Sequence, residues 1–445
     1  MGHDDDDGIR NSATTKTTAE AYQIRNVIYR LDRLPGAVFA RKGGLMHMAL
    51  KSMAMDWAWH VEYDGLFLAH LPCSVKMLLL SYIGVYTMDH DGTRAMRGLS
   101  PLFLKDGEQD YFVGYGDDLE VSRLDLGGAL GRWLTFKQLK NELIVSSKVK
   151  KASSTAVQVH KVEEEEEVTI PVSWDEDAGE EENHYYSPSS SSSSLDSNGL
   201  RFANLRFLSL AHPIPSAANW SSLINLLSCI KSITHLSLAH WPIPTATPNA
   251  MTATVRHPVH RSLIFSYGGT DAYTAMEDNW AEAVALLRKL SRATYCLQWL
   301  DLEGCGDWIR ALCWEGVGPD GEPYGSTGSI WNGPWRNVEW IGMGPGWIPP
   351  PDLDGSSSST LSRSLAHSIH APQSRNTDVD DDLPWDVEVE RIKYRQAKQV
   401  ERFRRLVEDA ETVGRRILDI RRQGKGKWVH FSLGLLDEGH KYGES

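Results

Sequence analysis

The sequence has few cysteines and no long hydrophobic run. Its five cysteines are scattered and odd in number, and no two are spaced as Cys-x-x-Cys, which argues against a disulfide framework and against a structural zinc site. No stretch approaches the roughly 18 apolar residues that a helix needs to span a bilayer. The aspartate-rich start of the chain is unlike a secretory signal. These absences predict an intracellular protein, cytoplasmic or nuclear, without a transmembrane segment.

The motifs of common enzyme classes are also missing. The chain contains no P-loop, no His-Glu-x-x-His and no Gly-x-Ser-x-Gly. A glycine-rich stretch runs from Gly342 to Gly346, but the prolines that follow cannot begin the helix whose N-terminus would hold a phosphate. We interpret this stretch as a turn, and we expect no cofactor, no metal ion and no catalytic residues.

Positive charge is scarce except near the end of the chain. The net charge of −13 argues against a nucleic-acid-binding role for the whole molecule. Between Arg391 and Lys427, however, 13 Lys and Arg residues face only five acidic ones. Apolar spacing of three and four predicts a helix over 384–423, followed by a tail over 424–445. We interpret this basic helix as a cap on the fold; the alternative is a patch for nucleic acid or for an acidic partner.

The chain does contain six copies of one short motif, which we call the phrase, with the spacing apolar-x-x-apolar-x-apolar. This spacing is typical of the strand in a leucine-rich repeat, in which alternate side chains point into a stacked core. The copies begin at Leu99, Val121, Leu205, Ile233, Leu297 and Val338.

Two of these copies also share their surroundings. Those at Leu205 and Ile233 lie 28 residues apart and continue with the same Ser-Leu-Ala-His turn, which indicates an internal repeat. Helical spacing predicts return helices over 220–230 and 274–292. A shorter helix is expected from Thr135, which forms a capping box with Gln138.

The predicted fold class is α/β: an irregular leucine-rich-repeat solenoid with parallel strands, an N-terminal helical cap and a long C-terminal helix. Helices in the cap are expected over 21–34, 46–60 and 71–86. Serine-rich and acidic stretches cannot bury enough apolar surface to offset chain entropy, and they predict disorder. The domains are a disordered start (1–17), the helical cap (18–86), the solenoid (87–352) with a disordered insertion (146–199), a disordered linker (353–383), the basic helix (384–423) and the tail.

The copy at Leu297 is the most complete, because it continues with two further residues and Cys305. The segment from Asp301 to Cys305 resembles the cysteine-type leucine-rich repeats common in F-box proteins, which implies that Cys305 buries its thiol in the turn. About half of the chain, including 71–83, 297–308, 335–347 and the basic helix, resembles a group of fungal leucine-rich-repeat-like proteins that are often labelled tafazzin.

These resemblances imply two further activities. The Leu71-Pro72 start of the helix over 71–86 is similar to an F-box helix, which implies docking to a Skp1-type adaptor in a ubiquitin ligase. The Trp-containing, arginine-rich segment expected after it is missing. The tafazzin label implies a phospholipid acyltransferase, which needs a His-x4-Asp motif so that the carboxylate orients the histidine as a base. No histidine here has that spacing, and His60 with Asp64 comes closest, so this activity is disfavoured.

The residues that flank the inward leucines point to the opposite face of the strands, because side chains alternate along a strand. The aromatic residues among them are typical of an interface core. We therefore predict a non-catalytic scaffold that binds a protein partner; alternatively, inserted loops or the terminal helix cover this face. The candidate contact residues are Phe103, Arg123, Asp125, Phe207, His235, Trp299, Asp301 and Trp340.

Overall fold

A computed structural model of the chain describes residues 26–87, 96, 98–103, 117–145, 199–246, 254–256, 264–266, 279–317, 323–324, 330–349 and 385–434. The predicted disordered segments 1–17 and 353–383 lie outside these residues. So does the predicted insertion over 146–199, apart from its last residue, and the part of the tail beyond residue 434.

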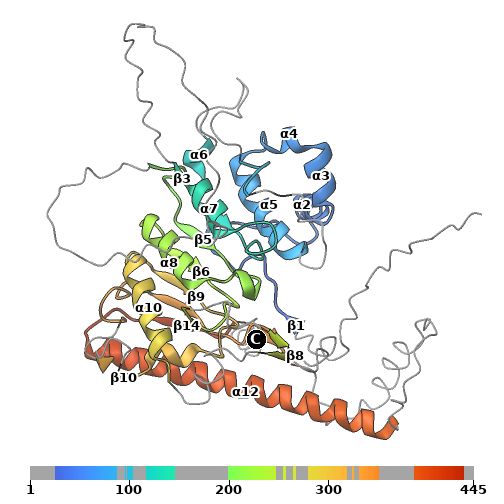
Figure 1. The fold of residues 1–445 in the computed structure, drawn as a ribbon. Coiled ribbons are helices and arrows are strands. Elements are labelled where there is room, and N and C mark those ends of the chain that lie inside the picture. Colours follow the sequence, from blue (N-terminus) through green and yellow to red (C-terminus); the bar gives the residue numbers. More distant parts are fainter. Residues whose placement is uncertain are drawn as a thin grey trace, which may run out of the picture.

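The centre of the molecule is a parallel sheet of six short strands (Figure 1). All neighbouring strands are parallel and pair in register. The prediction of an α/β fold with parallel strands is therefore confirmed. In spatial order the strands are β14 (His430–Ser432), β12 (Trp340–Gly342), β9 (Trp299–Asp301), β6 (His235–Ser237), β5 (Phe207–Ser209) and β2 (Arg123–Asp125).

The middle residue of each predicted strand is apolar and buried, which explains the shared register. These residues form one row across five strands: Leu124, Leu208, Leu236, Leu300 and Ile341. A slip of one residue would turn every one of these side chains to the other face of the sheet. The alternation therefore specifies both the burial of the strands and their alignment.

Five of the six phrases form strands of this sheet, and the first does not. Residues 99–103 form turns, and Leu99 and Leu102 are buried outside the sheet. Pro101 has no N–H to donate to a strand ladder. The sixth strand, β14, belongs to no predicted phrase, although Val429, Phe431 and Leu433 alternate as strand residues do.

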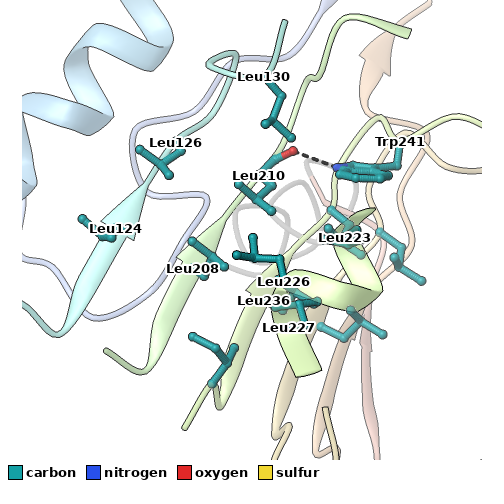
Figure 2. Packing of buried hydrophobic residues seen from close by; sticks show 14 of the residues in the cluster. Leu124, Leu126, Leu130, Leu208, Leu210, Leu223, Leu226, Leu227, Leu236 and Trp241 are labelled. Atoms are coloured by element: carbon teal, nitrogen blue, oxygen red, sulfur yellow. Dashed lines mark hydrogen bonds between the residues drawn. The ribbon is translucent and has the colours of Figure 1, made fainter. Parts of the chain in front are cut away.

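Helices cover one face of the sheet (Figure 1): α7 (Phe136–Leu143), α8 (Trp220–Cys229) and α10 (Ala281–Ala293). The predicted capping box of Thr135 and Gln138 is present at the start of α7. Figure 2 shows the leucines of α8 packed against those of the strands. Beside them, Trp241 Nε1 donates a hydrogen bond to the Leu210 carbonyl oxygen at 2.8 Å. The helices thus bury the apolar side of the sheet and leave its other face to the polar and aromatic residues.

The N-terminal helices lie at the β2 end of the sheet (Figure 1). α5 (Cys73–Tyr86) contacts β2 and α2 (Leu45–Met55), and the helix predicted over 71–86 is confirmed. The helix predicted over 46–60 is divided at Asp56 into α2 and α3 (Trp57–Tyr63), and α4 (Gly65–Leu68) follows.

The helix predicted over 21–34 is wrong for the residues that the structure describes. β1 (Asn26–Val27) is extended and pairs antiparallel with β13 (Trp347–Ile348), and Ile28 N donates to the Gly346 carbonyl oxygen at 3.0 Å. This segment obtains backbone hydrogen bonds from another part of the chain. The apolar spacing therefore reflects contacts with the sheet and its loops, not one face of a helix.

The opposite end of the molecule is closed by α12 (Trp385–Gln423) (Figure 1). This helix packs against η4 (Ile309–Cys313) and confirms the helix predicted over 384–423. In the part of the chain described, no helix is both long enough and apolar enough to cross a membrane. The remaining elements are α6 (Asp117–Glu120), η2 (Pro215–Ala217) and the antiparallel pairs β3–β4 (Ile144–Val145, Gly199–Leu200), β7–β8 (Thr254–Arg256, Ile264–Ser266) and β10–β11 (Gly316–Val317, Pro323–Tyr324).

Candidate functional site

The face of the sheet opposite the helices carries two rows of side chains. The first residues of β5, β6, β9 and β12 form what we call the aromatic row: Phe207, His235, Trp299 and Trp340. The third residues of β2, β5, β6 and β9 form what we call the polar row: Asp125, Ser209, Ser237 and Asp301. Alternation along each strand places both rows on one face, because the residue between them is buried against the helices.

The members of the aromatic row stack on one another. The ring centroids of Phe207 and His235 are 4.2 Å apart, and those of His235 and Trp299 are 6.1 Å apart. Trp299 and Trp340 are 4.4 Å apart and lie within 6° of parallel. All four side chains are half-buried, so the row is a rigid apolar strip that still reaches the surface.

The structure does not bring all the predicted contact residues to this surface. Phe103 lies away from the sheet, where it is buried against Phe202 with ring centroids 5.5 Å apart; its phrase forms no strand, so no alternation directs it to the face. Arg123, Asp125 and Asp301 lie in the predicted rows but are buried. They are buried because a segment of the same chain crosses the polar row, and a partner would reach only the aromatic row.

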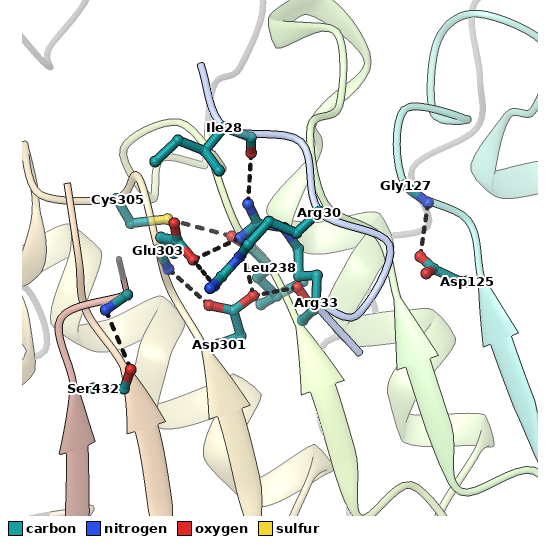
Figure 3. Close-up of polar contacts among 12 residues, drawn as sticks. Ile28, Arg30, Arg33, Asp125, Gly127, Leu238, Asp301, Glu303, Cys305 and Ser432 are labelled. Atoms are coloured by element: carbon teal, nitrogen blue, oxygen red, sulfur yellow. Dashed lines mark hydrogen bonds and ion pairs between the residues drawn. The ribbon is translucent and has the colours of Figure 1, made fainter. Parts of the chain in front are cut away.

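That segment is residues 26–36, which we call the N-terminal strap. Arg33 Nη1 lies 3.3 Å from Asp301 Oδ2 and 3.1 Å from Glu303 Oε2, and Arg30 Nη2 lies 2.5 Å from Glu303 Oε2 (Figure 3). Ser237 Oγ donates to Asp301 Oδ2 at 2.7 Å. Burial raises the pKa of Glu303, against the effect of Arg33. Together these contacts form one buried ionic network between the strap and the strand ends.

The far end of the strap reaches β2. Arg123 donates to the carbonyl oxygens of Leu34, at 3.1 Å, and Pro35, at 3.2 Å, and it lies 3.2 Å from Asp125 Oδ2. Gly36 has a φ of +88°, and its backbone lies close to the ring of Phe207. A Cβ atom added at Gly36 would lie 3.0 Å from this ring. Among the described residues, the N-terminal strap is the segment that covers the polar row. The sequence had suggested inserted loops or the terminal helix as the cover of this face.

Two histidines follow β5 and β6 at matching positions of the internal repeat. His212 and His240 have φ values of 53° and 60°, in the left-handed region that side chains other than glycine rarely adopt. Their rings stack 4.4 Å apart, and Tyr29 of the strap lies 4.6 Å from His212. Burial lowers the pKa of His212 well below its ordinary value, and nearby His240, Arg33 and Arg132 lower it further. His212 is therefore held neutral beneath the strap.

This pKa shift predicts a loss of stability at low pH. The unfolded-state pKa of histidine is about 6.5. As the pH falls below this value, the unfolded chain binds a proton that folded His212 does not. The free energy of unfolding therefore falls by about 1.4 kcal/mol for each unit by which the pH is lowered, until the folded-state pKa is reached. Urea unfolding at pH 7.5 and pH 5.5 measures this slope. The variant His212→Asn, which also tolerates a left-handed backbone, should show a smaller slope; an equal slope in both proteins contradicts this account.

The basic helix α12 is anchored by its second half. Ala410, Val413, Ile417 and Ile420 are buried, and ion pairs tie the helix to the sheet side: Arg402–Asp307, Arg310–Asp409 and Arg416–Glu315. Buried Arg421 donates to the carbonyl oxygens of Trp335, Arg336 and Val338, and burial lowers its pKa to about 10. These contacts fix the second half of α12 to the rest of the fold.

Cys305 is buried and donates to the Leu238 carbonyl oxygen at 3.3 Å, and burial raises its pKa; this confirms the buried thiol. No group of three or more His, Cys, Asp or Glu side chains in the described part is placed to hold a metal ion. His60 Nδ1 lies 2.8 Å from Asp64 Oδ2, and this pair joins adjacent turns at the end of α3.

Sequence reasoning missed the N-terminal strap and the ionic network beneath it. Arg30 and Arg33 are separated from Glu303 by some 270 positions, and the residues around them have the spacing of a helix. Comparison of the chain with known protein families, curated proteins and solved structures found no match.

Proposed function

We propose that this chain is a non-catalytic scaffold that binds a protein partner through the aromatic row of an irregular leucine-rich-repeat-like solenoid. The observation that carries the proposal is the stacked, half-buried pair of Trp299 and Trp340. Tryptophan is enriched among the residues that dominate binding energy at protein interfaces. A stack already formed in the free protein loses little conformational entropy when a partner covers it.

The architecture supports the same proposal. Five strands with the leucine-rich-repeat spacing lie parallel and in register, with helices on one face and the aromatic row on the other. In repeat proteins each unit contacts mainly its neighbours, and the extended face that results is used for binding. The anchored helix α12 would then be the terminal cap that such an array requires. The resemblance to fungal leucine-rich-repeat-like proteins fits this proposal.

The double variant Trp299→Ala with Trp340→Ala tests the proposal. Proteins recovered with the wild-type chain by affinity purification should be lost from the double variant, because the apolar centre of the interface is removed. The melting temperature should fall less than it does when fully buried tryptophans are replaced, since both rings are only half-buried. Quantitative mass spectrometry and thermal unfolding measure the two outcomes.

A matched control uses tryptophans of the core. Trp220 and Trp335 are fully buried, and their replacement by Ala should lower the melting temperature strongly. If Trp299→Ala with Trp340→Ala lowers the melting temperature as much as this control, the aromatic row belongs to the core. Retention of every partner by a stable double variant would also contradict the proposal.

A second candidate function is favoured by exposed apolar side chains on the N-terminal helices and just before them. Eight large apolar side chains between residues 38 and 67 are exposed, among them Leu45 at 80 %, Phe67 at 72 % and Trp59 at 53 %. Such a concentration is typical of a protein-binding surface. We propose as the alternative that this surface docks a Skp1-type adaptor and that the chain is an F-box-type subunit of a ubiquitin ligase.

The contact surface for this alternative would differ from the one that the F-box resemblance implies. The apolar residues of α5, including Leu79, Leu80 and Ile83, are buried within the chain's own core. An adaptor would therefore contact α2–α4. Co-purification of a Skp1-type adaptor that is lost in Trp59→Ala with Phe67→Ala supports this alternative, whereas loss in the Trp299 and Trp340 double variant supports the first proposal.

A further inference from the structure

The parallel sheet has an open edge at β14. At the other end of the sheet β2 is contacted by α5, whereas β14 pairs with β12 alone among the described residues (Figure 1). His430 N donates to the Glu339 carbonyl oxygen at 2.8 Å, and the Ser432 carbonyl oxygen accepts from Met343 N at 2.9 Å. Successive residues of a strand direct their backbone groups to alternate sides, so those of Phe431 point to the open edge. An edge of this kind is a template for a further strand.

The apolar core is incomplete at the same edge. Phe431 of β14 is in register with Ile341 of β12, which is in register with Leu300 of β9. Ile341 and Leu300 are fully buried, whereas Phe431 is only half-buried. Trp428, just before β14, is 70 % exposed. In a repeat array each unit packs on its neighbours, and in the described part of the chain β14 has no outer neighbour to cover these side chains.

The chain around this edge is basic. No acidic residue occurs over 420–434, where Arg422, Lys425 and Lys427 are exposed. Arg422 and Lys427 each pair with a carboxylate that is itself half exposed, and such surface pairs are weak. A negatively charged segment is therefore attracted to the edge. A second copy of this chain is a poor occupant, because pairing of two β14 edges would bring like charges together.

Residues 168–174, which lie outside the described part of the chain, have a sequence that matches this edge. Every second residue is apolar, as in a strand with one buried face; these residues are Val168, Ile170, Val172 and Trp174. Five glutamates precede the segment at 163–167, and three acidic residues follow it at 175–177. A segment with this much charge cannot bury enough apolar surface to fold alone, but it can order when it binds.

The chain is long enough for this segment to reach the edge. It belongs to the insertion between β3 and β4, with more than 20 residues on either side of 168–174. An extended chain of 20 residues spans about 66 Å. β14 is separated from β2 by five strand spacings, which is about 24 Å at roughly 4.8 Å each. The insertion can therefore cross the whole width of the sheet.

Pro171 determines the direction in which the segment pairs. In an antiparallel pair, directly opposite side chains lie on the same face and opposite residues can exchange both backbone hydrogen bonds. With Ile170 or Val172 opposite Phe431, the apolar side chains continue the core. The nitrogen of Pro171, which has no hydrogen to donate, then points away from β14, as is usual for proline on an edge strand. In a parallel pair with the same face buried, Pro171 would point toward β14 and leave a hydrogen bond unmade.

The antiparallel direction also matches the charges, because it places residues 175–177 beside Lys425 and Lys427. We propose that residues 168–174 of this chain dock antiparallel on the open edge of β14 and complete the sheet at that end. This contact is made within one molecule. It lies at the end of the sheet and is independent of the partner proposed for the aromatic row.

Photocrosslinking of the purified full chain tests the proposal. A photoreactive benzoylphenylalanine replaces Trp428, and mass spectrometry after irradiation identifies the peptides that are joined to it. We expect a crosslink to residues 163–177 in a product with the mass of one chain. The variant Ile170→Asp with Val172→Asp should lose this crosslink, because charges replace the apolar face of the segment.

A matched control places the same charges on the opposite face of the segment. Thr169→Asp with Ser173→Asp should retain the crosslink. If no crosslink reaches residues 163–177, or if it joins position 428 to residues 435–445 instead, the proposed segment does not cover the edge. Crosslinks between two chains would show that a second copy occupies it. An equal yield from the two double variants would show that charge alone brings the segment near, and each of these outcomes overturns the proposal.

Discussion

Replacing Arg33 by Met is expected to destabilise the fold by about 3–5 kcal/mol, the typical effect of removing one partner of a buried ion pair. The Arg33 side chain is only 4 % exposed, and the two carboxylates that it contacts are still less exposed, Asp301 at 2 % and Glu303 at 3 %. It also donates to the Ile28 carbonyl oxygen at 2.8 Å. Without Arg33, Asp301 would remain buried without its cation, and the strap would lose its central contact. Urea unfolding of Arg33→Met against the wild type measures the change.

Two further variants separate this effect from a simple loss of charge. Arg402→Met breaks a pair with Asp307 in which both side chains are more than 40 % exposed, and it should change stability little. Arg33→Met combined with Asp301→Asn removes one charge of each sign and leaves Arg30 paired with Glu303, so it should recover part of the loss. If Arg33→Met destabilises no more than Arg402→Met, the buried network does not hold the strap.

Replacing Leu238 by Ala is expected to cost about 2–5 kcal/mol, because it removes a fully buried side chain and leaves a cavity in a packed core. Leu238 is completely buried, and its carbonyl oxygen accepts the hydrogen bond from Cys305. Leu119→Ala is the matched control, since Leu119 is 56 % exposed and should cost much less. Denaturant unfolding measures both. A cost for Leu238→Ala as small as that of the control would contradict the packing of strands described here.

The strands and their buried faces were predictable because their pattern is local. Apolar residues at alternate positions, such as Leu236 and Leu238, must face the same side of a strand, and repetition of the phrase aligns one strand with the next. The rows opposite followed from the same alternation. The copy at Leu99 failed because its spacing matches while Pro101 lacks the N–H that a strand needs.

The N-terminal strap was not predictable from its own residues. Its apolar spacing is that of a helix, and the partners that make it extended lie near Asp301 and Gly346, far away in sequence. The burial of Arg123, Asp125 and Asp301 depends on the strap, so sequence alternation placed them on the correct face but with the wrong exposure. Local pattern gives the direction of a side chain, whereas its burial depends on segments that pack over it.

A protein partner that contacts the aromatic row should be captured there by site-specific photocrosslinking. A photoreactive benzoylphenylalanine replaces His235, between Phe207 and Trp299, or replaces Phe67 on the exposed surface of α4. Irradiation in cells followed by mass spectrometry identifies what each position touches. We expect a partner that is crosslinked from position 235 and that is lost when Trp299→Ala and Trp340→Ala are added. Crosslinks from position 67 alone would contradict it and would place the interface on the N-terminal helices.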